Sequence, residues 1–383
     1  MNLRRYRAIA RKEFLHIIRD PRSLSISLTL PLVILLLFGY ALSLDVNRIL
    51  TVVDDRDRSP ESRALIERFV SSGYFTVIGQ VGGTGQVSGT RQIDQLINSG
   101  RAMVAIVVPE SFAKQIARGQ EAEVQLLIDG SDSNTASIAR GYAENIVRQF
   151  ALEQREQAQN LRGLPKMKQP VDLRARIVYN DDLRSRNYIV PGLIAVILMI
   201  IASMLTSLTV AREWETGTME QLVSTPIRPI ELLLGKLTAF FAVGMVDMLV
   251  CLVAAVFVFD VPLKGSLLEL IAISMLFLFG VLCWGIMLST VAKNQAMAYQ
   301  MGMLTSFLPA FLLSGFIYST ENMPWLIQSI SYLVPARYFI TILKGIFLKG
   351  VALRVMWVEV LFLALYALLV FIRTMRKMRL KVA

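Results

Sequence analysis

The sequence has two cysteines, one histidine and few charged residues, and each shortage excludes a class of protein. Cys251 and Cys283 both lie in apolar stretches, so we expect no disulfide framework and interpret both as small packing residues. His16 has no second ligand close by in the sequence, which argues for a solvated side chain and against a metal site. Charged residues make up 18% of the chain, against about 25% in soluble domains, which argues against an ordinary cytosolic enzyme.

The charged residues that are present are unevenly placed. Residues 45–187 are polar and hold 19 basic and 18 acidic side chains, whereas the rest of the chain is apolar and carries most of the net charge of +11. Disorder is not indicated, because it needs low hydrophobicity together with high net charge. The pattern predicts a membrane protein with one sizeable water-facing domain.

Six apolar stretches are each long enough to cross a membrane, which takes about 20 residues. They are residues 24–44, 188–211, 237–259, 266–292, 296–318 and 351–372. Residues 324–348 are amphipathic and contain Arg337 and Lys344, so this part of segment 319–348 is expected to be a re-entrant or interfacial helical pair. The predicted fold class is therefore an α-helical polytopic membrane protein, with six transmembrane helices plus re-entrant helices and an inserted α/β domain.

The predicted organisation runs from a basic N-terminal segment to a basic tail. Its parts are an interface helix at 1–22, a transmembrane helix at 23–44, the inserted domain at 45–187, transmembrane helices two to six at 188–372, and the tail at 373–383. Six spans put both termini on one side, and basic residues beside spans favour the cytoplasm, so both termini are expected there. The same placement indicates membrane lipid, and not nucleic acid, as the partner of these charges.

Residues 3–19 are predicted to form a basic amphipathic helix that lies in the membrane interface and ends before Pro21. Its apolar face is expected to carry Leu3, Tyr6, Ala10, Phe14 and Ile17. The candidate functional residues of this interface helix are Arg5, Lys12, Glu13 and Arg19. A passive lipid anchor explains the pattern at least as well as a binding element for a partner protein.

Residues 45–187 alternate predicted strands with predicted helices, which is typical of a compact α/β domain. The strands are expected at 49–53, 75–78, 103–108, 124–128 and 175–179, and the helices at 61–70, 91–98, 111–118 and 134–161. The Gly82–Gly85 turn lacks the following Lys-Ser/Thr of a phosphate loop and is interpreted as a flexible loop. Because the domain contains no histidine, we expect no Ser/His/Asp hydrolase in it.

The segment 212–229, between the second and third spans, is predicted to contain a short cytoplasmic helix that ends at Pro226. Trp214, Thr218 and Leu222 repeat every four residues and would make one face, with Glu213 and Glu220, seven residues apart, on another. Such a helix offers an aromatic and acidic face to a soluble partner. The alternative is a solvated loop.

Three stretches of the chain resemble ABC-2-type export permeases. The first runs from Glu213 to Pro226 and has the family's pattern of Glu, Gly-Thr, Glu-Gln-Leu and Thr-Pro. The second comprises Leu-Ser-Gly-Phe at 313–316, Met-Pro at 323–324 and Pro-Ala-Arg-Tyr-Phe at 335–339, and the third opens at Lys12-Glu13. The resemblance covers the whole chain, and its large insert is similar to that of bacterial drug-type members with a big periplasmic domain.

This resemblance implies the permease subunit of an exporter for amphipathic or hydrophobic compounds, drugs among them, in the bacterial inner membrane. It places residues 45–187 in the periplasm, pairs the chain with a second permease as a homodimer or heterodimer, and adds two separate ABC ATPase subunits that use ATP and Mg. By family analogy, a periplasmic adaptor and an outer-membrane duct are further expected partners. The alternatives are a lipid or lipid-linked glycan exporter of the same family, and a non-transporting membrane receptor.

The chain itself is expected to have no catalytic residue, no metal site and no cofactor. Gly235-Lys236 is not a phosphate loop, because Ile230 stands where a Gly is needed and Leu237 replaces Ser/Thr. The residues that the resemblance assigns to ATPase coupling are Arg212, Glu213, Trp214, Glu215, Thr218, Glu220, Leu222 and Thr225.

Two features interrupt the predicted spans. Asp247 lies midway along the third span, where a charge is costly, and it contacts either substrate or a cation, or else a neighbouring helix or the dimer partner. Pro309 removes a backbone hydrogen bond within the fifth span and predicts a kink, with an outer gate or re-entrant turn after it. The candidate residues of a translocation path or gate are Asp247, Pro309, Ser314, Gly315, Phe316, Met323 and Pro324.

Overall fold

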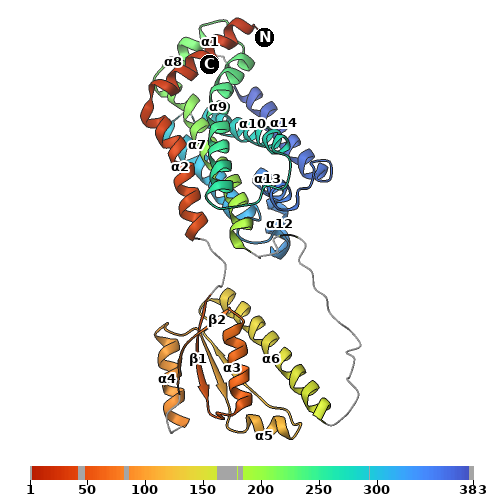
Figure 1. Cartoon of the computed structure of the whole chain (residues 1–383). Coiled ribbons are helices and arrows are strands. Elements are labelled where there is room, and N and C mark those ends of the chain that lie inside the picture. The colour runs from red at the N-terminus through yellow and green to blue at the C-terminus, as the bar shows by residue number, and fades with distance from the viewer. Residues whose placement is uncertain are drawn as a thin grey trace. The chain divides into compact units, whose positions relative to one another are not determined.

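The computed structural model describes residues 2–41, 48–81, 86–161, 179, 184–292 and 294–378. The chain divides into two compact units (Figure 1), one formed by Met1–Ser43 with Arg176–Ala383 and the other by Leu44–Ala175. The first unit is helical and the second contains a β-sheet.

The sheet of the second unit has four strands in the order β2-β1-β3-β4. Their bounds are β1 Ile49–Asp55, β2 Phe75–Gln80, β3 Val104–Val108 and β4 Gln125–Ile128. β1 pairs in parallel with β2 and β3, and β4 is antiparallel to β3. β3 consists of Val, Ala and Ile and is buried along its whole length, and β1 is buried at most of its positions, as central strands of a largely parallel sheet should be.

Helices cover both faces of this sheet (Figure 1). They are α3 Pro60–Ser71, α4 Gln86–Asn98, α5 Phe112–Ala117 and α6 Ser133–Leu161. α3, α5 and α6 share one apolar core with the sheet, and Ile93 of α4 belongs to a second core on the other face. Four strands and four helices thus occur where the sequence predicts them, whereas the predicted fifth strand at 175–179 and the Gly82–Gly85 loop fall almost wholly outside the described residues.

The helical unit is built from long apolar helices and several short ones. Its elements are α1 Leu3–Arg19, α2 Pro21–Ala41, α7 Ser185–Glu215, α8 Thr218–Val223, α9 Pro229–Phe257, α10 Leu267–Ala292, α11 Gln295–Leu308, the π-helix η1 Pro309–Leu313, the 3₁₀ turn η2 Thr320–Asn322, α12 Trp325–Ser331, α13 Pro335–Lys344, the π-helix η3 Gly345–Lys349 and α14 Trp357–Lys377. Pro21 begins α2 directly after α1, so the expected break lies where the sequence places it.

Five helical segments in the described part of the chain are long and apolar enough to cross a membrane: α7, α9, α10, α11 continued through η1, and α14. α12 and α13 with η3 form a pair bent by 83°, which is the geometry expected for the re-entrant pair and makes a sixth segment at most. The apolar part of α2 is shorter, at Ser27–Ala41. A count of six spans with α2 as the first stays a prediction.

α7 is the central helix of this unit and contacts α2, α9, α10, α11 and α13. Small residues permit these close crossings. A Cβ atom added at Gly285 of α10 would lie 1.9 Å from Thr206 Oγ1 of α7, and one added at Gly302 of α11 would lie 2.9 Å from Ser207 Oγ. Ser289 Oγ of α10 accepts hydrogen bonds from the backbone N–H groups of Val210 and Ala211 at 3.0 and 2.9 Å.

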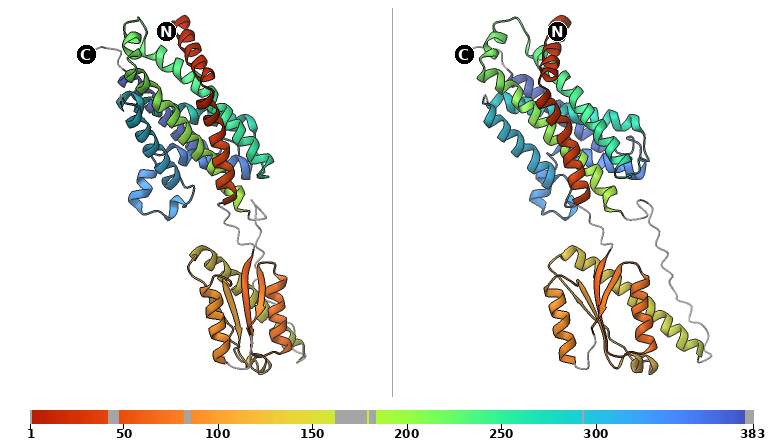
Figure 2. Two further views of the ribbon diagram at one scale, coloured as in Figure 1. Left: turned by 90° about the vertical axis from the view of Figure 1, so that its left-hand side faces the viewer. Right: turned by 60° about the vertical axis from the view of Figure 1, so that its left-hand side comes forward.

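α1 and α2 follow one another along the outside of the bundle (Figure 2). α1 packs on α9, and α2 packs on α7 and α9. We call the end of the helical unit that contains α1, α8 and the start of α11 the α1 end. The opposite end, which contains α12, is the α12 end.

Candidate functional site

The segment between α7 and α9 is not one helix, which corrects the expectation for residues 212–229. Trp214 belongs to the last turn of α7, and Thr218 and Leu222 belong to α8. Gly217 separates them with a φ of 69°, a left-handed conformation that glycine adopts without steric cost. The face expected from Trp214, Thr218 and Leu222 is therefore interrupted, while α9 begins at Pro229 after the expected proline break.

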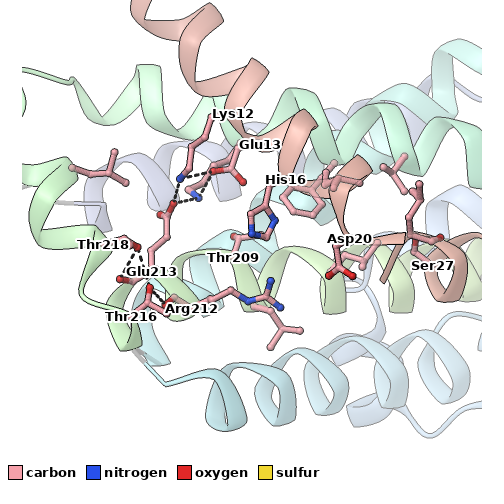
Figure 3. Close-up of a pocket in the computed structure, with 18 of the residues that line it drawn as sticks. Lys12, Glu13, His16, Asp20, Ser27, Thr209, Arg212, Glu213, Thr216 and Thr218 are labelled. Carbon is pink, nitrogen blue, oxygen red and sulfur yellow. Dashed lines mark hydrogen bonds and ion pairs between the residues drawn. The ribbon is translucent and has the colours of Figure 1, made fainter. Parts of the chain in front are cut away.

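Four charged side chains from three helices meet at the α1 end, and we call them the ionic cluster (Figure 3): Lys12 and Glu13 of α1, Glu213 of α7 and Lys236 of α9. Glu213 Oε1 lies 2.7 Å from Lys12 Nζ and 2.9 Å from Lys236 Nζ. Glu13 Oε1 lies 3.0 Å from Lys236 Nζ and 3.3 Å from Lys12 Nζ. Each carboxylate thus pairs with both ammonium groups, and the cluster ties α1, α7 and α9 together.

Most of this cluster is withdrawn from solvent. The Lys236 side chain is 1% exposed and the two carboxylate side chains 8% and 9%, whereas Lys12 is half exposed. Burial disfavours the charged form of Glu13, but Lys236 and then Lys12 outweigh it and lower the pKa of Glu13. Burial likewise opposes the charge on Lys12, yet its hydrogen bond to Glu213 and the two carboxylates raise its pKa. Glu13 and Lys12 are therefore both charged near neutral pH.

The burial of Glu213 corrects a second expectation. Glu213 and Glu220 were predicted to share an outward acidic face, but Glu213 points into the ionic cluster and only Glu220 is exposed. Sequence spacing cannot predict this difference in exposure, because the turn at Gly217 changes the direction of the chain between Glu213 and Glu220.

α1 is also fixed to the start of α9 by polar contacts. Glu231 accepts a hydrogen bond from the backbone N–H of Asn2 at 2.6 Å and another from that of Arg228 at 3.2 Å. Tyr6 Oη lies 2.8 Å from Thr238 Oγ1, and the Arg5 guanidinium donates to the carbonyl of Pro226. These contacts hold the beginning of α1 against the beginning of α9 and the chain just before it.

The buried side of α1 differs from the predicted apolar face. Ile9 and Glu13 are its buried residues, whereas Leu3 and Phe14 are about half exposed. Ile9 packs so closely on Gly235 of α9 that an added Cβ there would lie 2.6 Å from Ile9 Cγ2. The helical periodicity is correct, but the ionic partners of Glu13 decide which side turns inward.

The remaining predicted coupling residues lie around the same end of the unit. Glu215 accepts a hydrogen bond from the backbone N–H of Gln295 at 2.8 Å and also pairs with its side-chain amide, which links the end of α7 to the start of α11. Arg212 is exposed and donates to Gln295 Oε1 at 3.4 Å. Thr225 caps the end of α8 by donating to the carbonyl of Leu222 at 2.6 Å. Arg19 is exposed at the last turn of α1, away from the ionic cluster.

A cavity of about 700 Å³ lies beside the ionic cluster, between α1, α2, α7, α8 and α9. Its polar side includes the cluster, His16, Asp20 and Arg212, and its apolar side includes Leu24, Leu205, Leu208, Phe240 and Val243. The volume is within the range of about 300–1,000 Å³ that is usual for ligand pockets.

At the α12 end, part of the predicted gate comes together. Pro309 begins the π-helix η1, and Ser314, directly after it, donates to the carbonyl of Ala310. Phe316 is 3% exposed and rests on Gly192 of α7, where an added Cβ would lie 2.7 Å from its ring. Gly315 has a φ of 81°.

Aromatic rings surround this turn. The ring of Phe311 lies 5.4 Å from Phe307, 5.8 Å from Phe316 and 6.5 Å from Phe38, as centroid distances. The carbonyl of Gly315 accepts hydrogen bonds from Tyr188 Oη at 3.1 Å and from Lys344 Nζ at 3.4 Å. Met323 and Pro324 lie in the connection before α12 and make none of these contacts.

Asp247 belongs neither to the ionic cluster nor to the predicted gate residues that come together at the α12 end. It is 2% exposed within the helical unit, and its Oδ1 has no hydrogen-bond partner among the described residues. It does not line the cavity beside the ionic cluster. A role in contacting substrate or a cation stays a prediction.

Sequence reasoning missed three residues that organise the α1 end: Lys236, Glu231 and Gln295. In the sequence, Lys236 stands out only beside Gly235, in a pair that is not a phosphate loop. A signal for its role is nevertheless present, because a lysine at the beginning of an otherwise apolar helix needs an acidic partner.

Comparison with known proteins agrees with the sequence motifs. Residues 21–375 match the family model described as ABC-2 family transporter protein. The chain is 37% identical over 366 residues to the probable multidrug ABC transporter permease YbhS of Escherichia coli (strain K12), which covers 95% of this chain and 93% of that protein. It is 30% identical over 349 residues to the probable multidrug ABC transporter permease YbhR of the same organism, covering 91% of each. ABC transporter G family member 20 of Dictyostelium discoideum is 22% identical over 374 residues, which is 95% of this chain but 49% of that protein.

The ionic cluster leads to a first prediction. Lys236→Gln leaves two buried carboxylates with one half-exposed ammonium, so the free energy of unfolding should fall by about 3–5 kcal/mol. The measurement is the thermal unfolding midpoint of the purified chain in detergent. Lys264→Gln is the control, because Lys264 is exposed elsewhere in the unit and its loss should matter by less than about 0.5 kcal/mol.

Adding Glu13→Gln to Lys236→Gln should recover part of the loss, because it leaves a single buried carboxylate, Glu213, for the one remaining ammonium of Lys12. If Lys236→Gln unfolds at the same temperature as the parent protein, the cluster does not hold the three helices together.

Proposed function

This chain belongs to the ABC-2 family of transporter permeases, and from that premise we propose that it is the permease subunit of an ATP-driven exporter in the bacterial inner membrane. The proposed cargo is amphipathic or hydrophobic compounds. Two relatives with the multidrug permease names support this cargo, since each aligns over more than nine tenths of the chain.

The proposed exporter takes its energy from separate ATPase subunits. The chain lacks a phosphate loop at Gly235-Lys236, and Lys236 is occupied in the ionic cluster. The chain aligns with only about half of the Dictyostelium protein, which is consistent with a permease part that works beside other domains. The proposed assembly has two permease chains and two ATPases, and the ATPases hold the ATP and Mg.

The observation that supports this proposal is the ionic cluster, whose Glu213 lies in the chain just before α8. α8 follows the last turn of α7 after two residues, and Glu213 in that turn is held by Lys12 of α1 and Lys236 of α9. A push on α8 by an ATPase therefore moves the ends of three helices together and not α7 alone. Glu220 and the rest of the exposed side of α8 are the proposed contact surface.

The proposed orientation places the α1 end in the cytoplasm and residues 45–187 in the periplasm. The basic residues of α1 and of the last turn of α14 support it, because basic residues next to spans favour the cytoplasmic side. In this orientation the α/β unit is the part available to a periplasmic adaptor and an outer-membrane duct.

Purification of the tagged full-length chain from its native membranes tests the assembly. We expect an ABC ATPase to co-purify in equal amount, together with a second permease chain, and we expect ATP hydrolysis that amphipathic compounds stimulate. Recovery without any ATPase would overturn the exporter and favour a non-transporting receptor.

Charge reversal on α8 tests the coupling contact. Glu220→Lys should lower ATPase co-purification or ATP-driven transport several-fold, because it places a new positive charge on the proposed contact surface without disturbing a buried partner. Glu321→Lys is the matched control, since it is an equal charge change on an exposed residue at the α12 end. Equal transport by the two variants would show that α8 is not the contact.

We further propose that Phe316 and its aromatic neighbours close the path at the α12 end. Phe316 fills the space in front of Gly192, and η1 lets the backbone leave the regular helix at this point. The carbonyl of Gly315 is held from two helices, by Tyr188 and Lys344, which fixes the turn in the closed position.

Phe316→Ala should therefore raise the passive leak of a small dye through the protein in proteoliposomes without ATP, because it removes the ring that fills the space at Gly192. Leu308→Ala is the control, since Leu308 is an exposed residue of α11 that precedes η1. A leak no larger than that of the control would mean that Phe316 closes nothing.

A further inference from the structure

The cavity beside the ionic cluster has one charged side and one apolar side. Helices α1, α7 and α8 supply most of its polar groups, and α2, α7 and α9 supply Leu24, Leu205, Leu208, Phe240 and Val243. A site with this division suits a molecule that is itself divided into a polar head and an apolar part.

The charges of the cavity are not equally accessible. The acids Glu13 and Glu213 are buried and neutralised by Lys236 and Lys12, so neither offers a free negative charge. The bases are the exposed groups: Lys12 is half exposed, and Arg212 and His16 are exposed. Asp20 is the one further acid in the lining, and it comes from the end of α1 towards α2.

The basic side chains reach the same space from two helices. In Figure 3, His16 points from α1 and Arg212 from α7 into the gap between the helices, with Thr209 beside them. Lys12 has three donor hydrogens and two carboxylate partners, which leaves donor capacity on its exposed side. Arg212 makes one long hydrogen bond, to Gln295, through its Nε, so its terminal nitrogens are available in the described structure.

We propose that this cavity binds an amphiphile with an anionic head, such as a phosphate monoester or diester or a sulfate monoester. The head lies between Arg212, His16 and Lys12, and the apolar chain lies along Leu208 and Phe240 towards α2. This inference rests on the proposed function and deepens it, because it names anionic amphiphiles as the compounds that the exporter takes up at its inner side. The anionic head is common to two sources, a lipid of the inner leaflet and a soluble amphiphile.

Protection of an introduced cysteine from a maleimide tests the proposal. Thr209→Cys places a thiol in the cavity wall of the full-length chain, held in phosphatidylcholine nanodiscs, and the native Cys251 and Cys283 are fully buried. Dodecyl phosphate at about ten times its Kd should slow labelling about ten-fold, since the free fraction of sites falls in proportion. Dodecyltrimethylammonium has the same chain with the opposite charge and should leave the rate nearly unchanged.

Substitutions of the basic residues locate the head. Adding His16→Gln and Arg212→Gln should raise the concentration of dodecyl phosphate needed for protection about ten-fold or more, because charge-assisted contacts are lost. Arg11→Gln is the matched control, since Arg11 is an exposed base of α1 that does not line the cavity. Equal protection by the two dodecyl compounds, no protection by dodecyl phosphate, or an equal effect of Arg11→Gln would each overturn the proposal.

The lipid composition of the nanodiscs distinguishes a bound membrane lipid from a bound soluble amphiphile. Replacing part of the phosphatidylcholine with phosphatidylglycerol should slow labelling without added dodecyl phosphate if the bound molecule comes from the membrane. An unchanged rate, together with protection by dodecyl phosphate, identifies a soluble amphiphile. Failure of the proposed function is distinguishable, because it appears as absence of the ATPase from the purified complex, whereas failure of this inference appears as absence of protection of Thr209→Cys by dodecyl phosphate, whether or not the ATPase co-purifies.

Discussion

The arrangement of the α1 end depends on a buried lysine at the beginning of an apolar helix. Lys236 is almost fully buried, and an unpaired ammonium at such a position costs several kcal/mol. The carboxylates that offset this cost come from two other helices, Glu13 of α1 and Glu213 of α7. A polar requirement at one position of α9 therefore decides where α1 docks and how the last turn of α7 is held. It also explains why Glu13, and not an apolar residue, occupies the inner side of an amphipathic helix.

Below this cluster the bundle is held by close packing around α7, and the two kinds of interaction have different consequences. Glycines and serines allow α10 and α11 to approach α7, so that Gly285 lies against Thr206 and Ser289 accepts two backbone N–H groups of α7. Such contacts have little room for adjustment, because interiors are close-packed. The ionic cluster has adjustable partners, since each carboxylate is shared by two ammonium groups. The bundle thus combines a rigid middle with an end whose contacts are exchangeable.

Sequence patterns predicted the elements well and their tertiary partners poorly. The strand Val104–Val108 and the helix Ser133–Leu161 follow from local periodicity, and Pro21, Pro226 and Pro229 mark helix ends because their backbone chemistry is local. Glu213 was predicted to face a soluble partner, since a spacing of seven residues says nothing about the turn at Gly217. Asn2 and Glu231 are hydrogen-bonded although they are 229 positions apart in the sequence, and no periodic pattern in either segment predicts this contact. The motifs around Glu213 and Phe316 nevertheless lie at the two ends of the helical unit where the ATPase contact and the gate are proposed, because these motifs are defined by residue types and not by partners.

The ionic cluster and the cavity are physically linked, because Lys12 belongs to both. Its ammonium contacts Glu213 on one side and lines the cavity on the other. An anionic head bound at the proposed position attracts the same ammonium, and in doing so weakens its hold on Glu213 while Lys236 still keeps that carboxylate paired. The contact between α1 and α7 then loosens and the contact between α7 and α9 remains. If export proceeds as proposed, occupation of the cavity changes the mobility of the end of α7, which leads into α8. Binding of cargo then affects the proposed ATPase contact on α8 without a separate sensor.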